Sequence, residues 1–162
     1  MTSQHQYRVD VEWTGNRGSG TDSYRNYGRE HVIRIDGKPE LAGSADPTFH
    51  GDAARHNPED MLVIALSACH MLSYLHMATV AGVVVTAYTD AAEGTMAIEA
   101  DRGRFTEVVL HPVVTITAAS DLAKADAAHE TAHEACFIAN SVNFPVRCEP
   151  RMVVESGMGI GD

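Results

Sequence analysis

A long apolar segment occupies the middle of the chain, residues 57–82, and reads NPEDMLVIALSACHMLSYLHMATVAG. Its opening Asn-Pro-Glu-Asp is typical of a helix start, because asparagine caps the first turn, proline is tolerated there, and acids complement the helix dipole. No Asp, Glu, Lys or Arg occurs between Met61 and Ala81, and Gly82 is a common type of helix stop. The segment therefore predicts one long helix that is capped by Asn57 and ends at Ala81.

A helix of this length and composition is a candidate to cross a membrane, since about 20 apolar residues suffice. It nevertheless carries polar side chains along its whole length, and no other segment of the chain is comparably apolar. A helix that is apolar nearly all round is equally suited to the interior of a large protein or of an oligomer. We expect such burial and no membrane partner; the polar side chains are Ser67, His70, Ser73, Tyr74, His76 and Thr79.

The part of the chain before this helix predicts two strands and a long loop. Residues 7–13 alternate polar and apolar side chains, which indicates a half-buried strand, and residues 30–35 indicate a second. Three glycines in residues 15–20 permit a tight turn after the first strand. Residues 36–56 form a loop longer than most connections, and loops of that length often cover a functional site.

The part after the helix predicts three strands, a second helix and a last strand, at residues 83–89, 94–100, 105–117, 121–140 and 151–155. Arg102-Gly103 is expected to turn between the second and third of these strands. Pro112 marks a bulge or an edge position in the third strand, and Ser120 is expected to cap the helix. This order of elements predicts an α+β protein with largely antiparallel pairing.

The size and the charge of the chain limit its class. The chain has 162 residues and 44% apolar content, which suits one domain, residues 1–162, with a core at about 7–155 and a flexible tail at 156–162. A formal net charge of −10 argues against nucleic acid and against anionic membrane surfaces as partners, because both attract basic patches. Residues 1–8 lack the apolar region of a secretory signal, so we expect a cytoplasmic protein.

The three cysteines form no closed disulfide framework, and in a reducing cytosol a cysteine pair more often serves catalysis, redox sensing or metal binding. Cys69 lies midway along the apolar helix, where it is either a small packed hydrophobe or a reactive thiol. Cys136 follows His129 and His133 at helical spacing, so this face supplies either metal ligands or a single thiol directed at the first helix. Arg17, in the glycine-rich turn, is either the cation that favours a thiolate or a solvated turn residue.

Four short motifs occur here in combination: WTGNRG at 13–18, NPE at 57–59, SAC at 67–69 and AHEAC at 132–136. Each is common alone, but their order and spacing together are specific. By these motifs the chain resembles the OsmC/Ohr family of thiol-dependent peroxidases, from about Tyr7 to Glu155. The resemblance implies an α+β, OsmC-like fold in which antiparallel sheets wrap around two long central helices of an intertwined homodimer, with active sites at the subunit interface.

The family's functional residues fall on four positions of this chain. The resemblance implies that Cys69 is the reactive cysteine and Cys136 the second cysteine, with Arg17 and Glu59 as a charged pair beside them. The Cys69 thiolate is expected to attack a hydroperoxide and become a sulfenic acid, and Cys136 to condense with it to a disulfide that an external dithiol reduces. Arg17 is expected to favour the thiolate, and Glu59 to hold the guanidinium in a two-pronged pair. The resemblance implies no cofactor and no metal.

Helix geometry separates two of these residues. Cys69 follows Glu59 by ten positions, so on one straight helix their backbones are about 15 Å apart along the axis. Either the chain before Met61 is not helical and folds back, or Glu59 acts in the active site of the other subunit. We expect the second arrangement, which agrees with a site at a dimer interface.

The chain departs from the family pattern near both cysteines. Many members have proline after the second cysteine, whereas residues 137–142 continue apolar here. His70, after the first cysteine, either tunes the Cys69 thiol or faces a polar interior. Cys148 has no counterpart in the family pattern and is expected to pack at the start of a strand, with contact to Cys136 as the alternative.

These observations lead to two hypotheses about function. The first is a cysteine-based peroxidase that reduces organic hydroperoxides, and hydrogen peroxide less well, in oxidative or osmotic stress defence, because the apolar helix suits an alkyl group. The second is a non-enzymatic binding protein of the same fold that holds an apolar ligand, or a metal on His129, His133 and Cys136, at the dimer interface.

Overall fold

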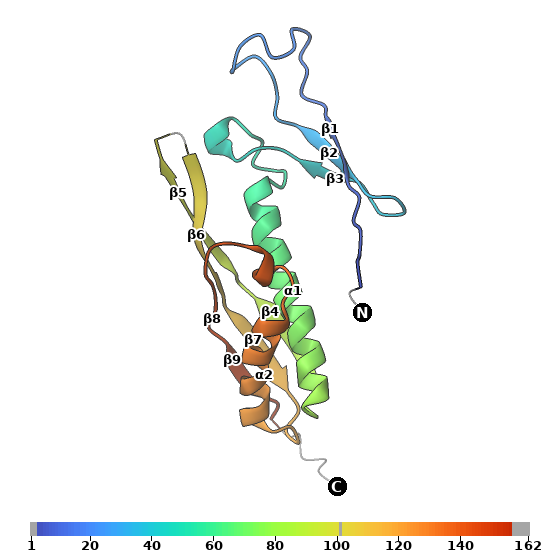
Figure 1. Ribbon diagram of the computed structural model, residues 1–162, viewed down its shortest axis with the longest axis vertical. Helices are drawn as coiled ribbons and strands as arrows, with labels where there is room; N and C mark the ends of the chain where they lie inside the picture. The colour runs from blue at the N-terminus through green and yellow to red at the C-terminus, as the bar shows by residue number, and fades with distance from the viewer. Residues whose placement is uncertain (1–2, 101, 157–162) are drawn as a thin grey trace. The chain divides into compact units, whose positions relative to one another are not determined.

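The computed structural model describes residues 3–100 and 102–156 and divides the chain into two compact units, Met1–Leu62 and Val63–Asp162. Figure 1 shows the elements of both units along the chain, with α1 (Pro58–Val80) and α2 (Leu122–Ala135) as its two α-helices among the described residues. The mixed α+β class predicted from the sequence is confirmed. The expected tail at residues 156–162 lies, apart from Ser156, outside the described residues.

The first unit is built on a small antiparallel sheet in the order β1-β2-β3. Its strands are β1 (Asp10–Trp13), β2 (His31–Arg34) and β3 (Leu41–Gly43), and a 3-10 turn, η1 (Pro47–Phe49), follows. The first strand is shorter than predicted. The prediction of one long loop at residues 36–56 is wrong in part, because this segment contains β3 and η1. Both elements are too short to show a periodic sequence pattern.

Helix α1 has the ends that the sequence predicts. The Asn57 side chain accepts a hydrogen bond of 2.7 Å from the backbone N–H of Asp60, as a helix cap does. Gly82 has a backbone φ angle of +74°, in the left-handed region that residues with a Cβ rarely adopt. This conformation ends the helix. Because Glu59 is helical, the chain before Met61 does not fold back.

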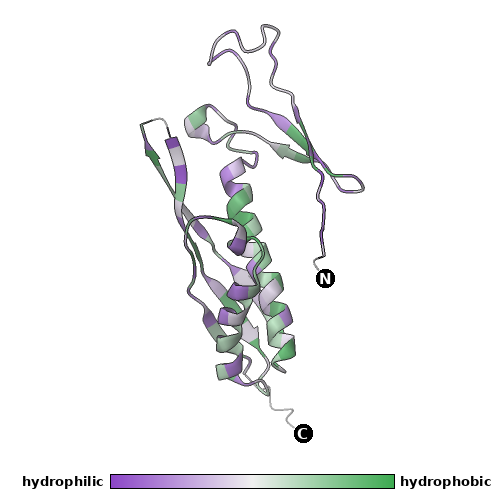
Figure 2. Cartoon of the chain, viewed as in Figure 1, coloured by the Kyte–Doolittle hydropathy of each residue, from purple (hydrophilic) through white to green (hydrophobic). Residues whose placement is uncertain are grey.

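Helix α1 is also long and apolar enough to cross a membrane. One such helix is weak evidence of a membrane protein, because the core helix of a soluble protein has the same length and composition. Figure 2 shows apolar residues along much of α1 and a more mixed pattern on α2.

The second unit contains two three-stranded sheets. The first has the strand order β4-β7-β9, with β4 at Val85–Asp90, β7 at Pro112–Ile116 and β9 at Arg151–Val154. The second has the strand order β5-β6-β8, with β5 at Glu93–Glu99, β6 at Arg102–Leu110 and β8 at Val146–Cys148. The long strands pair antiparallel, but β8 and β9 pair in parallel with β6 and β7. The predicted largely antiparallel pairing is therefore confirmed, but the expectation of antiparallel sheets needs correction, since these two sheets are mixed.

Two details of these strands differ from the prediction. The single strand expected at residues 105–117 is in fact two strands that belong to different sheets. The strand is interrupted at His111, whose backbone N–H donates a hydrogen bond to Asp90 Oδ1 at 2.7 Å. Pro112 begins β7, a position where its missing N–H costs least. Arg102 and Gly103 lie inside β6 and not in a turn.

Helix α2 is shorter than predicted and is capped by a different residue. Asp121, and not Ser120, accepts hydrogen bonds from the N–H groups of the first turn, at 2.9 Å from Ala123 and 3.1 Å from Lys124. Ser120 instead accepts from the N–H of Val84 at 2.9 Å. The helix ends at Ala135, and a second 3-10 turn, η2 (Ala139–Ser141), follows.

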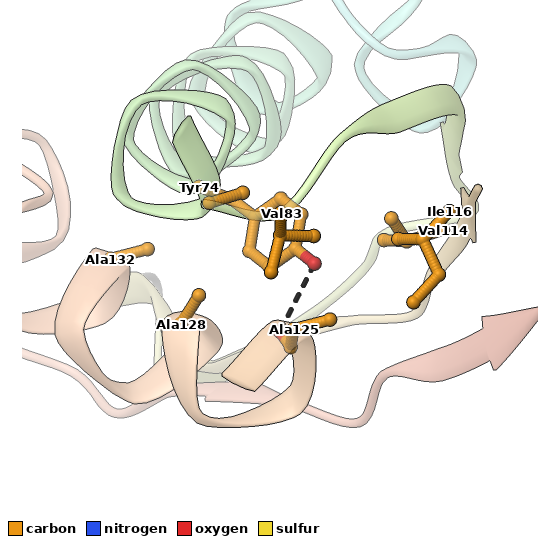
Figure 3. Packing of buried hydrophobic residues seen from close by; sticks show 8 residues of the cluster. Tyr74, Val83, Val114, Ile116, Ala125, Ala128 and Ala132 are labelled. Atoms are coloured by element: carbon orange, nitrogen blue, oxygen red, sulfur yellow. Dashed lines mark hydrogen bonds between the residues drawn. The ribbon is translucent and has the colours of Figure 1, made fainter. Parts of the chain in front are cut away.

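The core of the second unit lies between α1, α2 and the β4-β7-β9 sheet (Figure 3). Alanines spaced along one face of α2 leave room for the large Tyr74 side chain of α1, whose hydroxyl donates to the carbonyl of Ala125 at 3.1 Å. This packing holds the two helices side by side and positions the polar groups described next; the buried residues are Tyr74, Ala78, Val83, Val114, Ile116, Ala125, Ala128 and Ala132.

Candidate functional site

The thiols of Cys69 and Cys136 lie next to each other within the second unit, close enough for Cys69 to affect the pKa of Cys136. Cys69 comes from the middle of α1, and Cys136 is the first residue after α2. Both cysteines are unbridged; Cys69 is half-buried, whereas Cys136 is 1% exposed. The structure thus brings together the two cysteines that the sequence singles out.

The environment of Cys136 keeps it protonated. Burial, with a contribution from the neighbouring Cys69 thiol, raises the pKa of Cys136 to about 11. Since a thiolate and not a thiol is the nucleophile, Cys136 is not a first attacker at neutral pH. Its place next to Cys69 suits a thiol that reacts second.

The end of α2 explains how Cys136 reaches this position. Its backbone is extended and leaves the helix, although its N–H still donates to the carbonyl of His133 at 3.2 Å. The Cys136 carbonyl then accepts from the N–H of Asn140 at 3.0 Å as the chain turns. The helical face expected from His129, His133 and Cys136 is therefore interrupted before the cysteine.

Arg17 and Glu59 both lie in the first unit, and they form no ion pair among the described residues. Arg17 projects from a turn in which Asn16 Oδ1 accepts from the N–H groups of Gly18 at 2.9 Å and Gly20 at 3.1 Å. Its guanidinium is largely exposed and lies 3.9 Å from a carboxylate oxygen of Glu30.

Glu59 has one carboxylate oxygen, Oε2, that is buried and has no hydrogen-bond partner in the part of the chain that the structure describes. A buried carboxylate oxygen without a partner is costly, so this group is available to a donor outside the described chain.

A second cluster in the same unit consists of His70, His129 and Cys148, and no sequence pattern predicts it. His70 Nε2 lies 3.2 Å from His129 Nδ1, and the Cys148 sulfur lies 3.4 Å from the first and 3.8 Å from the second. Of the residues on the alternative metal face, His129 instead contacts His70, on the other helix. Cys148 ends β8 and does not begin a strand.

Burial controls the charge of this cluster. Burial, together with the nearby His70, lowers the pKa of His129 to about 4, and burial likewise lowers the pKa of His70. Burial raises the pKa of Cys148 to about 12. Both imidazoles are therefore neutral and the thiol is protonated at neutral pH. The sequence signal for the cluster is slight: His129 lies among the small inward-facing residues of α2.

An apolar pocket of about 360 Å³ lies along α1 in the second unit. Two of its lining residues are joined by a hydrogen bond, which the Ser67 hydroxyl donates to Asp90 Oδ2 at 2.5 Å. Cys69 is not among the lining residues, although its neighbour Ala68 is; the lining residues are Val63, Ile64, Ser67, Ala68, Met71, Tyr88, Thr89, Asp90 and Ala92.

Comparison with known proteins identifies the family. The model of the OsmC-like protein family matches residues 50–151. An OsmC-like protein of unknown function from Vibrio cholerae is similar at 33% identity and a TM-score of 0.82, with 91% of this chain and 99% of that chain covered. No curated protein matches the chain.

More distant structures share the fold. An organic hydroperoxide resistance protein OsmC from Legionella pneumophila is 18% identical, with a TM-score of 0.68 over 94% of this chain and 100% of that one. The organic hydroperoxide resistance protein OhrB of Bacillus subtilis is also 18% identical, with a TM-score of 0.59 over 91% and 98% of the two chains. At these identities the likeness extends to the fold alone. Taken together, the matching family model and the Vibrio cholerae relative show that this chain belongs to the OsmC-like protein family.

Proposed function

We propose that the protein is a cysteine-based peroxidase that reduces organic hydroperoxides. The observation that carries this proposal is the contact between the thiols of Cys69 and Cys136. The family adds support, since some of its members are named organic hydroperoxide resistance proteins.

The reaction begins at Cys69. Its thiolate attacks the terminal oxygen of the hydroperoxide, so that an S–O bond forms, the O–O bond breaks, and the alcohol leaves after taking up a proton. Cys69 is then a sulfenic acid. The peroxide has been reduced by two electrons, and the sulfur has been oxidised by two.

Cys136 completes the oxidative half of the cycle. Its sulfur attacks the sulfenic sulfur of Cys69, the thiol proton goes to the departing hydroxide, and water and a disulfide are formed. The raised pKa of Cys136 fits this order, because a thiol that stays protonated does not compete for the peroxide. An external dithiol, oxidised in turn, restores both thiols.

Arg17 and Glu59 support the reactive thiol from a second copy of the chain. Helix α1 is continuous from Pro58, so the backbone of Glu59 is about 15 Å from that of Cys69 along the axis. Arg17 favours the Cys69 thiolate, and Glu59 orients the guanidinium by a two-pronged pair. The active protein is therefore a homodimer, which we place in the cytoplasm.

The apolar pocket along α1 favours organic substrates. Its volume of about 360 Å³ is at the lower end for small-molecule sites, and aliphatic side chains make up much of its lining. An alkyl or aryl group gains from leaving water in such a pocket, whereas hydrogen peroxide has no apolar part to bury. We expect cumene hydroperoxide to be reduced faster than hydrogen peroxide.

The direct test is the rate of peroxide consumption with dithiothreitol as reductant. The wild-type chain is expected to turn over, Cys69→Ser to be inactive, and the matched variant Cys148→Ser to keep its activity. Activity that survives in Cys69→Ser contradicts the proposal. A wild-type chain that neither consumes peroxide nor forms a disulfide supports instead a binding protein of the same fold.

The dimeric site has a separate test. Glu59→Gln and Cys69→Ser are each expected to be nearly inactive alone. After the two variants are unfolded together and refolded, mixed dimers have one site with an intact Cys69 and an intact Glu59 from different chains. Recovery of activity is expected, and no recovery despite proven mixed dimers contradicts a shared site.

A further inference from the structure

Three side chains of types that can bind a metal converge on one point in the second unit, and they come from three different elements. His70 lies on α1, His129 on α2, and Cys148 at the end of β8. The Nε2, Nδ1 and Sγ atoms of these residues all lie within 4.8 Å of one another. This cluster shares no residue with the Cys69–Cys136 pair.

The geometry points to a metal site: we propose that His70, His129 and Cys148 bind one Zn²⁺ ion. Zinc bonds of 2.0–2.1 Å to nitrogen and 2.3 Å to sulfur, in a tetrahedron, place two nitrogens about 3.3 Å apart and a nitrogen and a sulfur about 3.5 Å apart. The cluster has 3.2 Å between its nitrogens, and 3.4 and 3.8 Å from the sulfur to each. Shifts of a few tenths of an ångström suffice to bring the ligands into place.

The surroundings hold the His129 ring in place and keep both imidazoles neutral. His129 stacks on the ring of Tyr74 with the ring centroids 3.9 Å apart, and Tyr74 is itself anchored by its hydrogen bond to Ala125. His70 and His129 are 1% and 4% exposed, so burial holds them neutral, which leaves a lone pair free for a metal.

The ligand set selects the class of metal. Imidazole and thiolate suit zinc and copper, whereas magnesium and calcium prefer oxygen ligands. Among these metals we assign zinc, because two histidines and one cysteine with an open fourth position match zinc chemistry without a change of oxidation state. On binding, the S–H bond of Cys148 breaks, a Zn–S bond forms, and the proton passes to solvent.

An acidic pocket connects the cluster to the surface of the unit. Its volume is about 530 Å³, and both His129 and Cys148 are among its lining residues. The carboxylates of Asp126, Glu130 and Glu134 also line it, and these acids raise the local concentration of cations. The fourth position on the metal therefore faces this pocket, where water or a small ligand can bind.

The test uses the full chain with Cys69→Ser and Cys136→Ser, so that Cys148 is the only thiol. After removal of metal with a chelator, calorimetric titration with Zn²⁺ is expected to show one ion per chain. Co²⁺ serves as a spectroscopic probe, and a thiolate-to-cobalt charge-transfer band is expected. Adding Cys148→Ser should abolish the band and weaken Zn²⁺ binding by about 100-fold or more, since losing even an outer-shell partner costs 10–100-fold.

Matched histidine variants locate the other two ligands. His129→Gln is expected to weaken binding strongly, while His76→Gln, an exposed histidine on the same long helix as His70, should leave it unchanged. Circular dichroism verifies that each variant is folded. A cobalt spectrum that persists in Cys148→Ser, or equal losses in His76→Gln and His129→Gln, overturns the proposal.

A further measurement needs no change at the cluster itself. In the background with Cys148 as the only thiol, stoichiometric Zn²⁺ is expected to slow alkylation of Cys148 by iodoacetamide, and Mg²⁺ is not. Equal rates with and without Zn²⁺ overturn the proposal. Because neither Cys69 nor Cys136 is present, the result is independent of peroxidase activity.

Discussion

His70 Nε2 lies 3.2 Å from His129 Nδ1, and this contact joins α1 to α2 one residue along α1 from Cys69. Consecutive residues on a helix point about 100° apart, so α1 presents the thiol and the imidazole in different directions. The same pair of helices thus carries the Cys69–Cys136 contact and the histidine cluster. Packing between the helices holds both groups in place.

Cys136→Ser is expected to stop the cycle at the sulfenic acid of Cys69. Without the second thiol no disulfide forms, so the sulfenic acid persists and reacts with dimedone. Mass spectrometry after one equivalent of cumene hydroperoxide should show one dimedone adduct per chain. Cys148→Ser serves as the control and should form the disulfide without an adduct. Absence of the adduct in Cys136→Ser argues against Cys69 as the first site of oxidation.

The free energy of unfolding of the metal-stripped protein is expected to fall as the pH drops from about 6.5 to 4. Burial lowers the pKa of His129 to about 4, whereas an unfolded histidine titrates near 6.5. In this window the unfolded state binds a proton that the folded state does not. The contribution of His129 to the free energy of unfolding is therefore fully present above about pH 6.5 and is lost as the pH falls below it.

One such proton changes the free energy of unfolding by up to about 1.4 kcal/mol per pH unit. Urea unfolding at several pH values measures this slope. His129→Gln removes the group, so its slope in the same window should be smaller than that of the wild type. Identical slopes mean that His129 does not titrate as described.

Tyr74→Phe is expected to lower the free energy of unfolding by about 1 kcal/mol. The change removes the hydrogen bond from the Tyr74 hydroxyl to the Ala125 carbonyl but keeps the ring in the core. Tyr7→Phe is the matched control, because Tyr7 is 90% exposed and should tolerate the change. If both variants unfold at the same urea concentration, the hydrogen bond does not stabilise the contact between the helices.

Asn57→Ala should destabilise the start of α1 by about 1 kcal/mol. The Asn57 side chain accepts a hydrogen bond from the N–H of Asp60, and alanine leaves that group unpaired. Asn57→Asp preserves the acceptor and is expected to stay near the wild-type stability. Thermal unfolding compares the three proteins, and equal losses in both variants would rule out the capping role.

Local sequence signals predicted the elements whose ends are set by neighbouring residues. Asn57 and Gly82 define the ends of α1 by side-chain capping and by backbone freedom, and both effects act over a few residues. The division between β6 and β7 was not predictable in this way. The apolar run continues through His111, and only the pairing with distant strands assigns its two halves to different sheets.

The same distinction applies to the functional residues. The motifs that contain Cys69 and Cys136 predict that these two cysteines act as a pair, and the structure places their thiols next to each other. The cluster of His70, His129 and Cys148 has no motif, because its members lie far apart in sequence and only the packing of α1, α2 and β8 brings them together. The sequence singled out His70 and His129 separately, each with other partners, and did not predict that they meet at Cys148.

The central claim is that Cys69 and Cys136 form a disulfide when the protein meets a hydroperoxide. Thiol counting by intact mass after alkylation, before and after one equivalent of cumene hydroperoxide without reductant, tests it most directly. With alkylation carried out in denaturant and chelator, the wild-type chain is expected to go from three free thiols to one, the survivor being Cys148, and Cys69→Ser is expected to keep both of its remaining thiols. An unchanged count of three in the wild-type chain would contradict the central claim.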